Sequence, residues 1–312
     1  MTANKCTIVP HLWYDTNARE AAAFYSSVFP DSGITHTTTL HDTPSGDCDI
    51  VSFRIWGQPF MAISAGPLFT FNPSVSFMVN YDPMRFDPSP SREANARDSL
   101  DEAWARLSEG GTVLMPIDEY PFSTRYGWIQ DRYGLSWQLI LSDPEGEPRP
   151  AIIPALLFTG NVCGKAEEAG AFYRSVFPGS VAGQLARYPA GMEPNREGTL
   201  MFSDFRLGKS WMVAMDSALD HGFAFNEAVS LMVHCDTQDE IDHYWSRLSS
   251  VPEAEQCGWC KDRYGLSWQI ASRLAEAAMT SGDRKTIDRV TQAFLKMKKL
   301  DLAVLEKVCR RE

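Results

Sequence analysis

The sequence has no apolar run close to the roughly 20 residues that a membrane-spanning helix needs. Its first residues, "MTANKCTIVPHLW", contain neither the apolar region nor the small-residue cleavage site of a signal peptide. We therefore expect a cytoplasmic protein that does not associate with membranes.

Positive charge is also scarce. The chain has 29 Lys and Arg against 40 Asp and Glu, which gives a net charge of −11 and a pI of about 5.1. Such a chain repels phosphate backbones, so we expect no nucleic-acid partner. Its seven cysteines are an odd number at irregular spacing, which is typical of free thiols in a reducing compartment.

Glycine-rich nucleotide loops are missing. No such loop follows a strand in the manner of a dinucleotide or S-adenosylmethionine site. The stretch "GNVCGKA" at 160–166 departs from the phosphate-loop pattern in its glycine spacing and in the Ala after its Lys. The sequence therefore does not support methyl transfer or phosphate chemistry.

The chain does contain an internal repeat. "FYSSVFP" at 24–30 returns as "FYRSVFP" at 172–178, "FTFNPSVSFMV" at 69–79 as "FAFNEAVSLMV" at 223–233, and "DRYGLSWQ" at 131–138 without change at 262–269. Repeated blocks in the same order indicate a duplicated domain. We predict a first domain at 1–148, a second at 149–272 and a C-terminal tail at 273–312, with the proline-rich stretch 142–150 as the linker.

Periodicity within each copy predicts strand, helix and three strands, twice over. The first helix has Asn17 and Glu20 spaced as a capping box. Residues 81–98, rich in Pro and Ser, predict an exposed loop. The tail predicts one amphipathic helix capped by Asp283. The fold class is α+β: four βαβββ units, two in each copy.

Paired βαβββ units with "FY..VF" in the first helix and "D.YG..WQI" in the last strand resemble the vicinal oxygen chelate superfamily, which has the glyoxalase and bleomycin-resistance fold. "FAFNEAVSLMV" and "QCGWCKDRYGLSWQI" are similar to its PhnB-like branch, often labelled 3-demethylubiquinone-9 3-methyltransferase. The resemblance covers nearly the whole chain. It implies tandem glyoxalase-like domains, each with two units forming a curved, mostly antiparallel sheet around a cleft.

The resemblance also implies metal-ligand positions on inner strands, usually His, Glu or Gln. In the first strands these positions align with Pro10 and Pro154, which have no donor. We expect the neighbouring His11 to point away from the cleft, because successive strand residues face opposite sides. In the last strands only Gln138 and Gln269 remain. We therefore expect no metal ion and no cofactor.

An aromatic and amide pocket is the alternative use of these clefts. Repeated aromatics in a small curved sheet are also typical of a core, and Asn before a strand is typical of a turn. The candidate ligand-binding residues are Phe71, Asn72, Trp128, Trp137, Gln138, Phe225, Asn226, Trp259, Trp268 and Gln269, with Arg125 and His221 as secondary candidates.

Cys257 and Cys260, two residues apart, resemble a redox dithiol. The repeat places them where the first copy has Tyr126 and Ile129, and a turn and a strand follow instead of a helix. We therefore interpret both as structural.

The leading hypothesis is a metal-free protein that binds a small, partly apolar molecule, either as a monomer with two pseudo-dimeric domains or as a homodimer. A metal-dependent lyase, dioxygenase or isomerase of the same superfamily is the alternative, and a methyltransferase is the third. No catalytic residue is assigned, and the sequence leaves open whether a reaction is catalysed.

Overall fold

The first copy folds into two βαβββ units, as predicted. The computed structural model describes residues 7–86, 91–143 and 148–310. The first unit contains β1 (Ile8–Tyr14), α1 (Ala18–Val28), β2 (Gly33–Thr43), β3 (Gly46–Ile55) and β4 (Gln58–Ser64). The second contains β5 (Val75–Tyr81), α2 (Arg92–Ser108), β6 (Thr112–Tyr120), β7 (Ser123–Gln130) and β8 (Ser136–Leu141).

The second copy repeats this order with one strand fewer. Its units are β9 (Ile152–Phe158), α3 (Ala166–Val176), β10 (Val181–Arg187), β11 (Leu200–Leu207) and β12 (Ser210–Asp216), then β13 (Val229–Cys235), α4 (Gln238–Leu248), β14 (Trp259–Lys261) and β15 (Ser267–Ser272). Only 12 residues separate 249 from 262, against 22 between 108 and 131. The fourth unit therefore has no counterpart of the nine-residue strand β6.

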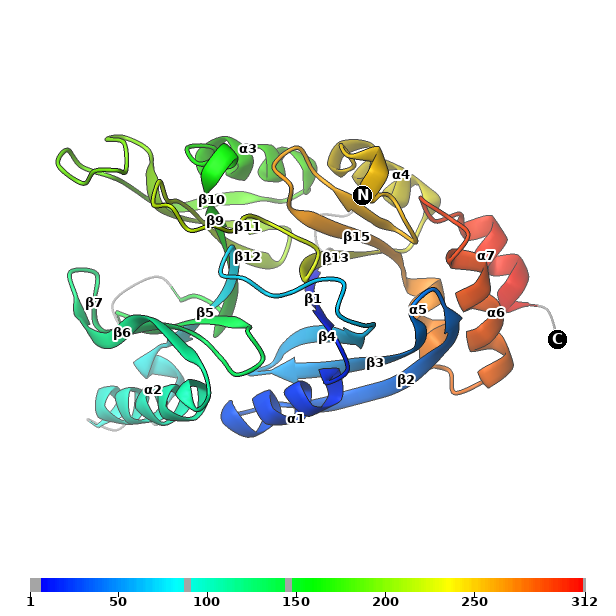
Figure 1. The fold of residues 1–312 in the computed structure, drawn as a ribbon, viewed down its shortest axis with the longest axis horizontal. Helices are drawn as coiled ribbons and strands as arrows, with labels where there is room; N and C mark the ends of the chain where they lie inside the picture. Colours follow the sequence, from blue (N-terminus) through cyan, green and yellow to red (C-terminus); the bar gives the residue numbers. More distant parts are fainter. Residues whose placement is uncertain (1–6, 87–90, 144–147, 311–312) are drawn as a thin grey trace.

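Two sheets hold the molecule together, and each combines one unit from either copy. The seven-stranded sheet has the order β14-β15-β13-β1-β4-β3-β2, and the eight-stranded sheet has β10-β11-β12-β9-β5-β8-β7-β6. Most strand pairs are antiparallel, and the copies join through β1 with β13 and β5 with β9. In Figure 1, α1 and α2 lie below the sheets and α3 and α4 above them. The α+β class is confirmed, but the units share their sheets between copies and not within one copy.

The C-terminal segment differs from the single helix that the sequence predicts. It forms α5 (Arg273–Thr280), α6 (Arg284–Phe294) and α7 (Leu302–Cys309), at the right-hand end of Figure 1. The predicted cap is confirmed, because the Asp283 side chain accepts from the Lys285 amide. The segment also hydrogen-bonds next to β14, with Cys257 N donating to Met297 O at 2.8 Å and Gly258 N to Lys298 O at 2.7 Å. The segment after α6 therefore supplies backbone acceptors beside β14, where the fourth unit lacks a counterpart of β6.

Two local predictions are wrong. Asn17 makes no side-chain cap bond, and the Ala18 amide instead donates to Ser64 Oγ at 3.1 Å. Residues 81–98 are not one loop, because β5 extends to Tyr81, a 3₁₀ turn covers Pro83–Arg85, and α2 already begins at Arg92. Residues 87–90 of this stretch, and 144–147 of the predicted linker, lie outside the described residues.

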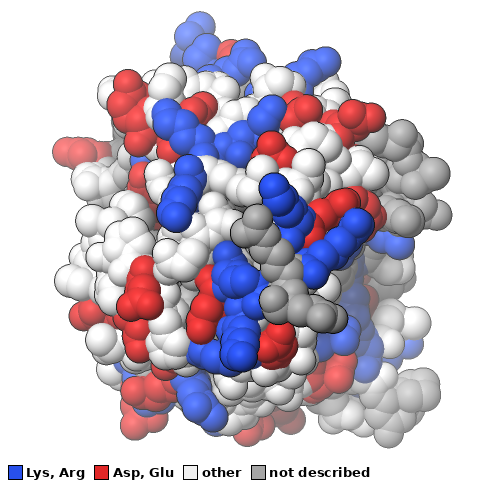
Figure 2. Space-filling view, turned by 90° about the vertical axis from the view of Figure 1, so that its right-hand side faces the viewer, with Lys and Arg blue, Asp and Glu red and all other residues white. Residues whose placement is uncertain are grey.

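Figure 2 shows the end of the molecule that carries the C-terminal helices, with basic and acidic side chains side by side. Lys298 pairs with Glu255 and Lys299 with Asp242. The basic residues of the tail are therefore largely compensated locally. No helix in the described part of the chain has both the length and the apolar character needed to cross a membrane.

Candidate ligand-binding site

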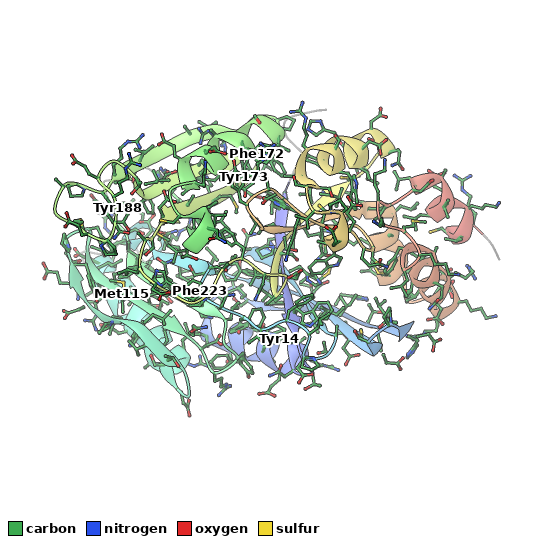
Figure 3. All side chains as sticks on the ribbon, turned by 45° about the horizontal axis from the view of Figure 1, so that its top comes forward. Tyr14, Met115, Phe172, Tyr173, Tyr188 and Phe223 are labelled. Carbon is green, nitrogen blue, oxygen red and sulfur yellow. The ribbon has the colours of Figure 1, made fainter. Side chains whose placement is uncertain are left out.

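The repeated "FY" and "DRYGLSWQ" motifs meet around a buried carboxylate in each copy. Asp131 Oδ2 accepts from Tyr25 OH at 2.8 Å and from Trp137 Nε1 at 2.9 Å, and its Oδ1 accepts from two amides of its own turn. Asp262 has the same four bonds, with Tyr173 and Trp268. Figure 3 labels Tyr173 in the second copy and, in the first, Tyr14, whose hydroxyl lies 3.2 Å from that of Tyr25.

These bonds place two predicted site residues in the interior. The Trp137 and Trp268 side chains are fully buried on the helix-covered face of their sheets. Burial raises the pKa of both aspartates, although their hydrogen bonds oppose the shift. The motif that carries the family resemblance is therefore a packing unit.

Phe71, Phe225, Asn72 and Asn226 lie where the copies meet. The two rings are buried and contact Tyr14 and Phe158 edge to face. Asn72 Nδ2 donates to Ala224 O at 3.0 Å, and Asn226 Nδ2 donates to Thr70 O at 2.8 Å. Each Asn Oδ1 also accepts an amide two residues on. The asparagines therefore combine the expected turn chemistry with a reciprocal link between the copies.

A cavity of about 130 Å³ lies on the other face of the seven-stranded sheet, and we call it the His11 cavity. Its walls come from strands of both copies and from the C-terminal helices. The lining includes His11, Trp13, Leu40, Ile50, Met61, Ile63, Met232, His234, Cys257, Trp259, Gln269, Ala271, Glu276, Met279, Phe294 and Leu300. Of the predicted residues it contains Trp259 and Gln269.

His11 faces this cavity, and the prediction that it points away is wrong. Its ring lies 5.4 Å from the Trp259 ring, edge to face, and its side chain is 3% exposed. The prediction takes Pro10 as the residue that faces the cleft, and moving a strand by one residue turns every side chain to the other face. Burial lowers the pKa of His11 to about 3, so the imidazole is neutral at pH 7.

Gln269 and its counterpart Gln138 differ in their hydrogen bonds. Both ends of the Gln138 amide are bonded: its Oε1 accepts from Tyr126 OH at 2.8 Å, and its Nε2 donates to Ser76 Oγ at 2.7 Å. Gln269 Nε2 donates to Ser230 Oγ at 2.8 Å. In the described part of the chain no group donates to Gln269 Oε1.

The same positions of the eight-stranded sheet are filled differently. Ala155 stands where the other sheet has His11, and it packs in a small apolar cluster with Met78, Ile153 and Val213. Trp128, the counterpart of Trp259, donates its Nε1 to Ser136 Oγ at 2.7 Å. The two copies have therefore diverged at this face, and of the two equivalent strands β1 and β9 it is β1 that carries a histidine at this position.

Sequence reasoning missed His234 and Glu276. His234 lies four residues after Ser230 on β13, so strand alternation could have placed it on the cavity face. Its Nε2 is 3.4 Å from Glu276 Oε2 on α5, and burial lowers its pKa although Glu276 opposes the shift. Glu276 gave no signal, because α5 reaches the cavity only through tertiary packing.

His11, His234, Gln269 and Glu276 are the polar residues that line this cavity from four different elements. Within the described ranges, no group of three or more His, Cys, Asp or Glu side chains is arranged to hold a metal ion. No chemical step is derived through a metal.

The remaining candidates have structural partners. Arg125 pairs with Asp101 at 2.8 Å, and His221 Nε2 lies 2.7 Å from Ser217 Oγ beside a shallow surface depression. Cys257 and Cys260 are free thiols, and burial raises the pKa of both. A raised pKa is the opposite of what a redox thiol needs.

Sheets assembled from paired βαβββ units define a glyoxalase-fold protein. A model of the family described as 3-demethylubiquinone-9 3-methyltransferase matches residues 6–140 and again 150–271, and the chain belongs to this PhnB-like family of the vicinal oxygen chelate superfamily.

Two solved structures illustrate the similarity. A PhnB protein from Bacillus cereus is 30% identical and covers 43% of this chain and 98% of its own, with a TM-score of 0.36. Glyoxalase I from Zea mays is 12% identical, covers 89% of this chain and 98% of its own, and has a TM-score of 0.53, which shows a common fold. No curated protein matches the chain.

Proposed function

We propose that this protein binds a small, largely apolar molecule in the His11 cavity without a metal ion. The observation that carries the proposal is the cavity itself, whose walls are mostly indole, thioether and aliphatic groups with a few polar groups between them. Ligand sites of proteins commonly have this composition. An engineered cavity of about 150 Å³ binds benzene, so about 130 Å³ suits a molecule of one ring.

The position of the cavity supports the same proposal. It lies between strands of both copies, and α5 and α6 contribute Met279 and Phe294 to its wall. On the eight-stranded sheet, Ala155 at the position of His11 belongs to a small apolar cluster with Met78 and Ile153. We also propose that the protein is located in the cytoplasm. The six cysteines that the structure describes are free thiols, which is typical of a reducing compartment.

The test is a titration of the full chain with toluene. Binding is monitored by the change in tryptophan fluorescence, to which Trp13 and Trp259 contribute, and by the change in the unfolding temperature. We expect saturable binding with a Kd on the order of 1 mM or tighter. Ala271→Ile introduces the residue that the other sheet has at this position, Ile140, and should fill the cavity. We expect it to weaken toluene binding by at least about tenfold, while Ile140→Val leaves binding unchanged.

Elemental analysis of the dialysed protein separates the proposal from the metal-dependent alternative. We expect no stoichiometric transition metal and unchanged toluene binding after treatment with a chelator. A stoichiometric ion that is lost in a Gln269→Ala variant would overturn the metal-free part of the proposal and favour a lyase, dioxygenase or isomerase. Absence of binding by toluene and by other one-ring molecules in the wild-type protein would overturn the binding part.

A further inference from the structure

Several polar atoms of the residues that line the His11 cavity make no hydrogen bond in the described structure. His11 Nδ1 and His234 Nε2 are buried and make none, although His234 Nε2 lies 3.4 Å from Glu276 Oε2. Gln269, 8% exposed, has its Nε2 bound to Ser230, and nothing described donates to its Oε1, which is not one of the fully buried atoms. A buried polar group without a partner costs about 1–3 kcal/mol, whereas an accessible acceptor is free to pair with water or with a ligand. A ligand that hydrogen-bonds to the Gln269 oxygen and to the His11 imidazole would use groups that the protein leaves open.

The open acceptor on Gln269 follows from one difference between the copies. In the first copy the Tyr126 hydroxyl donates to Gln138 Oε1. The repeat places Cys257 at the position of Tyr126. Cys257 lies in a turn with φ of 54°, outside β14, and its thiol is contacted by Gln256 Nε2 at 3.3 Å. The second copy has therefore lost a phenolic hydroxyl at the site where the first copy keeps one.

His11 and Gln269 line the same cavity, and Ser230 on the strand between them connects them. His11 on β1 stands directly opposite Ser230 on β13 in the strand register. Ser230 Oγ is the atom to which Gln269 Nε2 donates. Directly opposite residues have Cβ atoms about 4.5–5.5 Å apart. One small group in the cavity can therefore reach both His11 and the Gln269 amide.

The hydrogen-bond donors and acceptors of the cavity wall determine which chemical group fits between His11 and Gln269. The neutral imidazole of His11 offers one acceptor and one donor, and Gln269 Oε1 offers an acceptor. A hydroxyl, which both donates and accepts, matches this pair. A carboxylate does not, because it would meet the Gln269 oxygen and lie in the same cavity as Glu276.

The remaining wall suits an aromatic ring. Trp13 and Trp259 face each other edge to face at 6.2 Å. Met61, Met232 and Met279 add thioethers, which make favourable contacts with aromatic rings and adapt to irregular shapes.

We propose that the ligand of the His11 cavity is a one-ring aromatic molecule with a hydroxyl group, of which phenol is the simplest. The hydroxyl takes the place that the Tyr126 hydroxyl has in the other sheet, between His11 and Gln269, and the ring lies among the indoles and methionines. This proposal rests on the proposed function, because it specifies the ligand of the same cavity.

The test compares phenol, toluene and benzoate on the wild-type full chain by calorimetry. We expect phenol to bind about tenfold more tightly than toluene, which is the effect of about 1.4 kcal/mol from hydrogen bonding. We expect benzoate to bind more weakly than both. Equal affinity for phenol and toluene, or a preference for benzoate, would overturn the hydroxyl proposal while leaving apolar binding intact. If neither phenol nor toluene binds, the proposed function itself fails.

A variant pair locates the hydroxyl. Gln269→Met keeps the size of the side chain and removes the acceptor, so phenol affinity should fall to the level of toluene while toluene affinity stays within about twofold. Gln138→Met is the matched control in the eight-stranded sheet and should leave phenol binding unchanged. Loss of phenol preference in the control variant and not in Gln269→Met would overturn the assignment. The wild-type comparison decides the ligand class even if a variant does not fold.

Discussion

Asp131 and Asp262 are the residues around which each copy is built. Each buried carboxylate accepts a tyrosine hydroxyl from the first unit of its copy and an indole from the second. The repeat conserves this arrangement between the copies because removing any donor leaves a buried carboxylate short of a partner. The hydrogen bond joins a helix of the first unit (α1 or α3) to the turn before the last strand of the second unit (β8 or β15), so a single residue ties the two units of a copy together.

Replacing the tyrosine tests this role. Tyr25→Phe and Tyr173→Phe should each lower the free energy of unfolding by about 1–3 kcal/mol, because the substitution leaves a buried carboxyl group short of a donor. Urea unfolding followed by circular dichroism measures the change. Tyr133→Phe is the control, since its hydroxyl bonds to the exposed Glu20, and it should cost under about 1 kcal/mol. Equal costs for Tyr25 and Tyr133 would contradict the interpretation.

The neutral state of His11 predicts a pH dependence. Burial lowers the pKa of His11 to about 3, whereas the unfolded chain has a value near 6.5. The contribution of the neutral His11 to the free energy of unfolding is complete above pH 6.5. It is lost as the pH falls from about 6.5 towards 3, because over this range the unfolded state binds a proton that the folded state does not. Between pH 7 and pH 5 we expect a loss of about 2 kcal/mol from this residue.

The measurement is urea unfolding at pH 7 and pH 5 for the wild-type protein and for His11→Phe. The variant should lose about 2 kcal/mol less stability between the two pH values. Identical losses in both proteins would show that His11 is protonated or solvated in the folded state.

Among the elements, α5 and α6 have the clearest consequence for the site. They cover the open face of the seven-stranded sheet, and Phe294 and Met279 form part of the cavity wall. In the fourth unit, which lacks a strand, the segment after α6 also bonds to the backbone beside β14. The tail therefore completes both the sheet and the cavity.

Removing a side chain from this cover should change ligand exchange. Phe294→Ala should accelerate phenol association in stopped-flow fluorescence, because entry no longer requires the ring to move. It should also lower the free energy of unfolding by about 1–3 kcal/mol, since the ring is half-buried. Val304→Ala on the exposed side of α7 should leave both unchanged within about 0.5 kcal/mol. Unchanged association in Phe294→Ala would mean that ligands enter elsewhere.

At the scale of the whole molecule, the copies depend on each other. Each sheet needs strands from both, and Asn72 and Asn226 bond reciprocally across the junction. Separating the copies would expose the edges of β1, β5, β9 and β13. Exposed strand edges promote association.

The prediction is that neither half folds as a stable monomer. Residues 1–148 and 149–312, produced separately, should elute as oligomers or aggregates in size-exclusion chromatography with light scattering. Co-expression should give a one-to-one complex that binds toluene as the full chain does. A monomeric half with a cooperative unfolding transition would contradict this dependence.

The repeat and its periodicities predicted the four units, their order and most of their strands, because these follow from local patterns of apolar residues. The capping box at Asn17 does not form: the Asn17 side chain makes no cap bond, and the first free amide of the helix, that of Ala18, donates to Ser64, 46 residues further along the chain. The sequence prediction for His11 is wrong because it takes the neighbouring Pro10 as the residue that faces the cleft, and successive strand residues face opposite sides. Trp137 is predicted as a site residue but lies in the core. The sequence pattern shows that its side chain is on one face of the strand, but it does not show whether that face is covered by the helix or borders the cavity.

The sequence by itself therefore determines the secondary structure elements and their duplication, because these depend on contacts between residues that are close together in the chain. Only the tertiary structure decided that the units share sheets between the copies, that both ends of the Gln138 amide are bonded while nothing described donates to Gln269 Oε1, and that α5 and α6 close one cavity. These outcomes depend on contacts between different strands and helices, from Tyr126 with Gln138 on neighbouring strands to His11 with Ser230 on strands of different copies. The energies that select among them arise only when the sheets and helices pack.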